Sequence, residues 1–372
     1  MGQGNKPLIR TDLKSTKRIT SIDALRAFAL LGILLVHTAQ LYNFYQPDND
    51  FSHFSSLDNS LRDLILNLFE NKCRTIFSIL FGASFYLILR NPQNSIIRFC
   101  WRCILLMGFG IINQIAFSTD ILTCYGFTGI VLALLPIRKL QPTYLFMLAA
   151  IIYILQFFPL FDIQSFVFPQ ADYTLRYSEK QSLYHYLSYP LCSILKDNTH
   201  VFSGGIIASL SYFIFGYALG RSGYIEKIHL LANLRNICYI FLITIFLRII
   251  CKLTGYSVPV LQMSRLSTSL CYAILFIRLH MYIQQYMYPM ECYGKLGLTN
   301  YSTQNICCPL FILGFALPRH LSFAHILFYA IIFFLLQIFF AVTWLKHHKY
   351  GPWEYVWRKM TNIIKPFHPI AN

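Results

Sequence analysis

Three polar residues interrupt the first apolar segment of the chain and could carry out acid–base chemistry. Asp23, Arg26 and His37 lie in a stretch that is otherwise apolar enough to cross a bilayer. Charged groups at membrane depth are costly unless they face a partner or a polar cavity, so they mark functional sites by default. In a helix, the step from Arg26 to His37 returns to within about 20° of the same face after a rise of about 16 Å. We expect one helix face to carry an Asp23–Arg26 ion pair and, further along, a proton-accepting imidazole.

Two other segments contain polar residues that could hold an anion or support a base. Lys72 and Arg74 open an apolar segment, where they either extend to lipid headgroups or bind an anion. Asp120 precedes a further apolar segment that contains Tyr125. This carboxylate either caps the following helix or meets a histidine and raises its basicity.

Polar residues also gather near the C-terminus, at the start of an apolar segment. Lys295 is followed by Thr299, Asn300, Tyr301 and Gln304. Backbone amides at a helix N-terminus, together with Lys295, could bind a phosphate-bearing ligand. The alternative is that Asn300 and Gln304 form hydrogen bonds between helices, as polar residues inside membranes often do.

Composition places the chain among polytopic membrane proteins. Of its 372 residues, 56% are hydrophobic and 12% are charged, and the mean hydropathy is +0.50. The net charge of +16 comes from short basic clusters between apolar runs, which is typical of cytoplasmic loops, so we expect no nucleic-acid partner. The 11 cysteines match no zinc or disulfide spacing, and we expect no metal.

A window of roughly 19 residues gives about ten expected spans, and these predict an all-α, polytopic membrane helical bundle. The spans are 19–42, 73–89, 99–118, 121–137, 143–161, 201–220, 236–254, 266–288, 298–317 and 323–345. We expect a single transmembrane domain over residues 1–372, with external loops at about 43–72 and 162–200 and a cytoplasmic tail at about 346–372. The aromatic loop 162–200, with His185, suits an interfacial helix or a lid over a sugar.

Four blocks of the sequence resemble, in order and spacing, the YeiB-like family, number 418 among domains of unknown function. The blocks are Ile22 to Arg26, Cys73 to Gly82, Gly297 to Tyr301, and Gly351 to Glu354 with Trp357 and Arg358. That family is distantly similar to transmembrane acyltransferases, including the acyltransferase-3 enzymes and the heparan glucosaminide acetyltransferase type. The resemblance implies a helical bundle of about ten spans and the transfer of an acyl group from cytoplasmic acyl-CoA.

The resemblance also assigns positions in this chain. Arg26 and His37 match the acyltransferase-3 pair, although His37 stands where YeiB-like proteins often have asparagine. A further set matches YeiB-like motif positions: Lys72, Arg74, Asp120, Tyr125, Asn300 and Gln304.

We expect an inner-membrane (plasma-membrane) enzyme that acylates a cell-envelope carbohydrate or a lipid-linked acceptor. We expect His37 to act as the general base or to carry the acyl group itself, Arg26 to orient the donor, and Asp23 to hold Arg26. Membrane lipids are expected partners, acyl-CoA is the expected co-substrate, and no particular oligomeric state is predicted. Two alternatives remain: a transporter or flippase in which Arg26, His37 and Asp120 line a path, and a non-catalytic scaffold.

The distribution of lysine and arginine predicts the topology, with both termini in the cytoplasm. Reporter fusions after Arg18, Lys139 and Lys346 should be cytoplasmic, and fusions near Asn49 and Lys180 should be external. Paired alkaline phosphatase and fluorescent-protein fusions measure this directly. A cytoplasmic signal at Lys180 would overturn the span count and place His37 at the wrong face.

Overall fold

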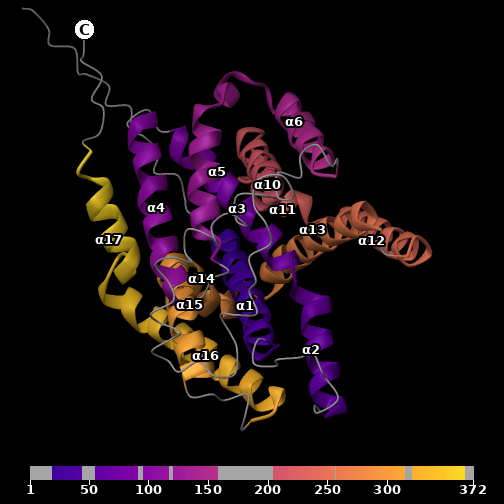
Figure 1. Ribbon diagram of the computed structural model, residues 1–372. Helices are drawn as coiled ribbons and strands as arrows, with labels where there is room; N and C mark the ends of the chain where they lie inside the picture. The colour runs from indigo at the N-terminus through magenta and orange to yellow at the C-terminus, as the bar shows by residue number, and fades with distance from the viewer. Residues whose placement is uncertain are drawn as a thin grey trace, which may run out of the picture.

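The computed structural model describes residues 19–43, 55–90, 95–116, 120–157, 204–255, 257–314 and 321–364. Within these ranges all regular secondary structure is helical (Figure 1). The elements are α1 (Thr20–Asn43), α2 (Ser56–Phe69), α3 (Lys72–Leu89), α4 (Ile96–Ala116), α5 (Leu122–Leu134), η2 (Pro136–Lys139), α6 (Pro142–Leu155), α10 (Gly204–Arg221), α11 (Ile228–Leu231), α12 (Leu234–Leu253), α13 (Val258–Tyr282), η5 (Gln284–Tyr286), α14 (Tyr288–Lys295), α15 (Gly297–Gly314), α16 (Phe323–His347) and α17 (Pro352–Thr361).

The prediction of an all-α membrane protein is confirmed. Each of the ten expected spans coincides with a helix, and six helical segments are long and apolar enough to cross a membrane. These six are Thr20–Tyr42, Ser56–Leu89, Ile96–Gln114, Leu234–Leu253, Val258–Tyr282 and Phe323–His347. The helices α5 and α6 are apolar but shorter, so the count of about ten stays a prediction.

One expected loop contains a helix. Residues 43–72 were expected to be an external loop, but α2 occupies most of the described part of this range. Ser55 caps α2 by accepting a hydrogen bond from the amide of Asp58, and the left-handed backbone of Asn71 separates α2 from α3. Apolar residues in this range, among them the buried Ile65, allow α2 to pack against the bundle as a helix. The other expected loop, 162–200, lies outside the described residues.

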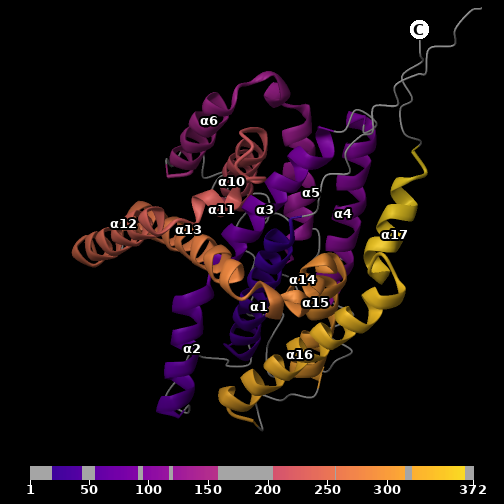
Figure 2. The same ribbon diagram turned by 180° about the vertical axis from the view of Figure 1, so that it is seen from behind.

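Helix α1 lies in the middle of the bundle, and both views place it between α3, α14, α15 and α16 (Figures 1 and 2). Most of its side chains are buried, including the small residues Ala24, Ala27, Ala29 and Ala39. Small side chains let neighbouring helices approach closely, which favours helix packing in lipid. The polar residues of α1 are therefore enclosed by protein.

Two glycines allow the closest helix contacts. A Cβ atom built at Gly294 on α14 would overlap the backbone carbonyl of Asp23, and one at Gly82 on α3 would overlap the backbone of Phe213 on α10. Gly82 therefore lets α3 and α10 pack backbone to backbone. Gly294 fixes α14 directly against the start of α1, beside the Asp23–Arg26 pair.

Alanine at Gly294 should destabilise the protein, because the new methyl group forces two backbones apart. Overpacking of this kind typically costs about 1–3 kcal/mol. The matched control is Gly108→Ala on α4, where an added Cβ meets no atom within 4 Å. Thermal unfolding in detergent should show a lower midpoint for Gly294→Ala and an unchanged or higher midpoint for Gly108→Ala. Equal midpoints for the two variants would contradict the packing account.

Candidate functional site

The four sequence blocks, which are far apart in the chain, border one cavity. We call this space of about 270 Å³ the Arg26 cavity. The blocks contribute Arg26, Phe77, Phe81, Gly297, Leu298, Tyr301, Glu354, Trp357 and Arg358 to its lining. Arg102 of α4 and Lys295 of α14 complete the charged part of the wall. The described lining therefore holds four cationic side chains and one carboxylate.

The predicted ion pair between Asp23 and Arg26 is present. The guanidinium of Arg26 donates one hydrogen bond from Nη1 to Asp23 Oδ1 at 2.8 Å and another from Nη2 to Ser84 Oγ at 2.6 Å. Asp23 is 1% exposed, so its carboxylate compensates the cation without competing for space in the cavity. The pair fixes the direction in which the Arg26 side chain lies.

The carboxylate of Glu354 caps α15. Its Oε1 atom accepts hydrogen bonds from the amides of Leu298 at 2.8 Å and Thr299 at 3.0 Å, and Oε2 accepts one from the Thr299 hydroxyl. A carboxylate at a helix N-terminus is favoured by the helix dipole. The backbone amides of Leu298 and Thr299, which were expected to bind a phosphate-bearing ligand, thus bind the Glu354 carboxylate of the protein itself. Lys295 still lines the cavity beside Arg26.

His37 lines a separate, smaller space of about 190 Å³, the His37 cavity. Gln40, Glu70 and Arg74 lie in the same lining, so Arg74 is placed beside the imidazole as a possible anion-binding group. Lys72 is not part of this lining. Its ammonium donates to the carbonyl of Asn67 at 2.6 Å and so satisfies the end of α2.

Asn305 of α15 connects His37 to Asp120. The Asn305 side chain lies beside the imidazole of His37, and Asn305 Nδ2 lies 3.4 Å from Asp120 Oδ1. Asp120 also accepts hydrogen bonds from Asn113 and from the amides of Leu122 and Thr123. Asp120 therefore caps α5 and contacts Asn305. Its second expected role, that of raising the basicity of a histidine, stays a prediction.

Asp120 lies between α4 and α5, outside the candidate spans. Burial raises the pKa of Asp120 to about 6, while the hydrogen bonds from Asn113 and from the two amides act in the opposite direction. The carboxylate is therefore mostly ionised at neutral pH, and it can fix the orientation of Asn305.

A layer of aromatic rings lies where the linings of the two cavities meet. Tyr301 lines the Arg26 cavity, and its hydroxyl accepts a hydrogen bond from the amide of Ile121, which lines the His37 cavity. Phe77 stacks between Tyr301 and Tyr125, with centroid distances of 6.5 and 6.0 Å. Arg26 and His37 thus share one helix but open into different spaces.

The remaining predicted site residues form buried contacts between helices. Asn300 Nδ2 donates to the carbonyl of Tyr293 at 2.9 Å, and Gln304 Nε2 donates to Gln337 Oε1 at 3.1 Å. Tyr125 is fully buried and hydrogen-bonded to Ser78. None of these three predicted residues lines the Arg26 or the His37 cavity. The geometry favours the alternative of hydrogen bonding between helices for Asn300 and Gln304.

Several residues in these sites were missed by the sequence-based prediction. Asn305 follows Tyr301 by four residues, as Gln304 follows Asn300, so the spacing could have indicated two polar faces on α15. Arg102 was not singled out, and Arg358 was named only as part of a sequence block, with no role assigned to it. His280 was also missed: it is buried on α13, with Nε2 2.9 Å from Glu291 Oε1.

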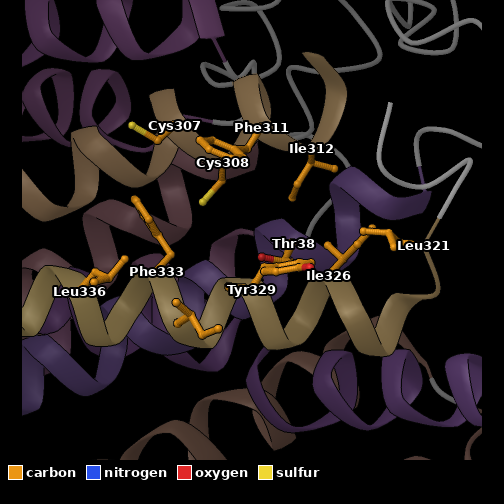
Figure 3. A pocket seen from close by; sticks show the side chains of 12 residues that line it. Thr38, Cys307, Cys308, Phe311, Ile312, Leu321, Ile326, Tyr329, Phe333 and Leu336 are labelled. Atoms are coloured by element: carbon orange, nitrogen blue, oxygen red, sulfur yellow. The ribbon is translucent and has the colours of Figure 1, made fainter. Parts of the chain in front are cut away.

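A third space, the α15–α16 groove of about 590 Å³, is almost entirely apolar. Figure 3 shows Cys308, Phe311 and Ile312 on one side and Tyr329 and Phe333 on the other. The hydroxyl of Thr38, which follows His37, also reaches this groove but donates to the carbonyl of Leu34. The described lining contains no carboxylate, imidazole or amine, so acid–base chemistry is assigned to the smaller cavities.

Comparison with known proteins supports the resemblance. Residues 219–364 match the family described as "Protein of unknown function (DUF418)". The chain is 27% identical over 359 residues to the "Uncharacterized 39.9 kDa protein in amylase 3'region" of Bacillus acidopullulyticus, which covers 93% of this chain and 94% of the relative. It is 26% identical over 404 residues to the uncharacterized protein YxaH of Bacillus subtilis (strain 168), and this match covers 96% of this chain and 97% of the relative. A match to the uncharacterized protein YeiB of Escherichia coli (strain K12) is 33% identical over 72 residues and covers 19% of each chain.

Asparagine at position 120 should destabilise the protein, because its amide group cannot accept all the hydrogen bonds that the carboxylate accepts. Leaving a buried donor unsatisfied typically costs about 1–3 kcal/mol. The control is Asp63→Asn, since the Asp63 side chain is 59% exposed. Thermal unfolding should show a lower midpoint for Asp120→Asn alone. Equal unfolding midpoints for the two variants would show that the hydrogen bonds of Asp120 do not stabilise the site.

Proposed function

We propose that this chain, whose residues 219–364 match the DUF418 family, is a YeiB-like membrane protein that acts as an acyltransferase. It moves an acyl group from acyl-CoA to a hydroxyl or amine of a cell-envelope carbohydrate or a lipid-linked acceptor. The observation that carries the proposal is the pairing, on one helix, of a cationic cavity beside Arg26 with a second cavity that holds His37.

His37 is the general base of the proposed reaction. The acceptor oxygen or nitrogen bonds to the thioester carbonyl carbon as its proton passes to the imidazole. The carbon–sulfur bond then breaks, and the CoA thiolate takes up that proton as it leaves. A base that is oriented by a second group, itself held by a third, is typical of sites that activate weak nucleophiles.

The Arg26 cavity is the donor site. Arg26, Arg102, Lys295 and Arg358 provide positive charge for an anionic donor, and Phe77 and Phe81 provide apolar surface for its thioester arm. The donor nucleotide stays at this end, while the thioester extends toward His37. The Phe77–Tyr301 layer must open for that movement, so the reaction includes a conformational step.

The proposed topology places the two sites on the correct sides of the membrane. With both termini in the cytoplasm, the beginning of α1 and Arg26 lie on the side where acyl-CoA is available. His37 then lies toward the outer face of the plasma membrane, where an envelope acceptor is found.

A second candidate function, that of a transporter or flippase, is favoured by one observation. Two separate cavities, one at Arg26 and one at His37 of the same central helix, also suit alternating access to a bound solute. The two functions differ in a covalent product. Purified protein that moves a substrate but never releases free thiol from acyl-CoA would support the transporter.

Alanine at His37 should abolish acyl transfer while leaving abundance nearly unchanged. Loss of a general base typically lowers the rate by about 100-fold to 10,000-fold. Release of free thiol from acyl-CoA, measured with purified protein and an envelope extract as acceptor, gives the rate. The control is His325→Ala, because His325 is exposed at the start of α16. His37→Asn is the sharper variant, and full activity in it would exclude the general-base role.

Lysine at Arg26 should weaken donor binding more than asparagine at Asp23 does. An ammonium cannot contact Asp23, Ser84 and a donor anion with the planar geometry of a guanidinium. If the pair is only structural, the order inverts, because Asp23→Asn leaves a cation uncompensated at membrane depth. Acyl-CoA affinity and protein abundance distinguish the two cases. Wild-type donor affinity in Arg26→Lys would remove Arg26 from the donor site.

A further inference from the structure

A strongly basic cavity lies between α4 and α17, next to the Arg26 cavity. This α4–α17 cavity has a volume of about 360 Å³, within the range of sites for small molecules. Its charged residues are Arg98, Arg102, Arg358 and Lys359, and no acidic residue is found in its described lining. Such a concentration of one charge needs a counter-ion.

Hydrogen bonds hold α17 firmly against α4. The indole of Trp101 donates to the carbonyl of Met360 at 3.0 Å, and the indole of Trp357 donates to the carbonyl of Arg102 at 3.1 Å. Arg98 Nη2 donates to Asn362 Oδ1 at 2.6 Å. Figures 1 and 2 both show α17 running beside α4. The walls of the cavity are therefore formed before any ligand binds.

Aromatic rings position two of the cations. The guanidinium carbon of Arg102 lies 4.4 Å from the centroid of the Trp357 ring, and that of Arg358 lies 4.1 Å from the centroid of Tyr350. Such contacts stabilise a cation but leave its hydrogen-bond donors available. The buried Nε atom of Arg102 has no hydrogen-bond partner within the described part of the chain.

The arginines also repel one another. Arg102 is close enough to Arg98 and Arg358 for both to act on it as like charges, and no carboxylate belongs to the described lining of the α4–α17 cavity. Surface cations usually extend into water to reduce such repulsion, but here the side chains converge. A polyanion between them would replace repulsion with attraction and would satisfy the Arg102 donor.

We propose that the α4–α17 cavity binds the phosphate groups of a ligand whose remainder enters the Arg26 cavity. A phosphate group suits this cavity because a planar guanidinium can donate two parallel hydrogen bonds to two phosphate oxygens. The extension into the Arg26 cavity follows because Arg102 and Arg358 line both spaces. Naming the ligand as CoA, with its several phosphates and long arm, rests on the proposed function.

Phosphate groups at this depth can come from two sources, a soluble cofactor-like donor or a lipid headgroup. Purified protein in neutral phosphatidylcholine nanodiscs is titrated with CoA and with pantetheine, which has the arm but no phosphate. In a second arm, nanodiscs that contain phosphatidylglycerol are used, and bound lipid is counted by native mass spectrometry.

The variants are Arg102→Gln and Arg358→Gln, with Lys359→Gln as an exposed alternative in case either fails to fold. The control is Arg278→Gln, because Arg278 also lies over a tyrosine ring, 4.8 Å from the Tyr282 centroid, but lines none of these cavities. Helical content and thermal midpoint confirm that each variant is folded.

The proposal expects wild type to bind CoA more than tenfold more tightly than pantetheine. The cavity variants should lose about tenfold to a hundredfold in CoA affinity, with pantetheine affinity and the control unchanged. If phosphatidylglycerol binding depends on the same arginines and CoA does not bind, the cavity is a phosphate site for lipid. That result would contradict acyl-CoA as the donor. If the binding of neither ligand depends on Arg102 or Arg358, the proposal of a phosphate site is wrong. The acyltransferase proposal is then tested separately by the activity of the His37 variants.

Discussion

The buried ion pair between Asp23 and Arg26 constrains the rest of the described bundle. A cation at membrane depth needs a fixed partner, and here the partner carboxylate is enclosed by the close contact of α14 at Gly294. Ser84 of α3 accepts the second hydrogen bond of Arg26. The pair thus joins three helices, and the wall of the Arg26 cavity depends on their relative positions.

Helix α15 makes polar contacts with both sides of the bundle. Its first turn is capped by Glu354, one face carries Tyr301 and Asn305 toward Asp120, and another carries Asn300 and Gln304 toward Tyr293 and Gln337. One helix therefore closes the Arg26 cavity and also orients the histidine of the other cavity. This coupling gives a physical route by which binding at one end can affect the other.

Local spacing predicted part of this site, and contacts distant in sequence account for the rest. The Asp23–Arg26 pair follows from a step of three residues, and the helix positions follow from apolar runs. Local spacing did not predict that Arg26 and His37 open into different cavities. The aromatic rings between them come from α3, α5 and α15, which are distant in the sequence. The cap by Glu354 spans 55 residues to Thr299, and no local pattern indicates such a contact. Asn305 likewise joins α1, through His37, to the connection between α4 and α5, through Asp120.

A cryo-electron microscopy structure of the protein with saturating CoA tests the central claim most directly, namely that the four blocks assemble a donor site. The account predicts density for phosphates against Arg102 and Arg358, and density for the arm passing Arg26 toward the Phe77–Tyr301 layer. Density for CoA elsewhere on the protein, with both cavities empty at saturation, would contradict it.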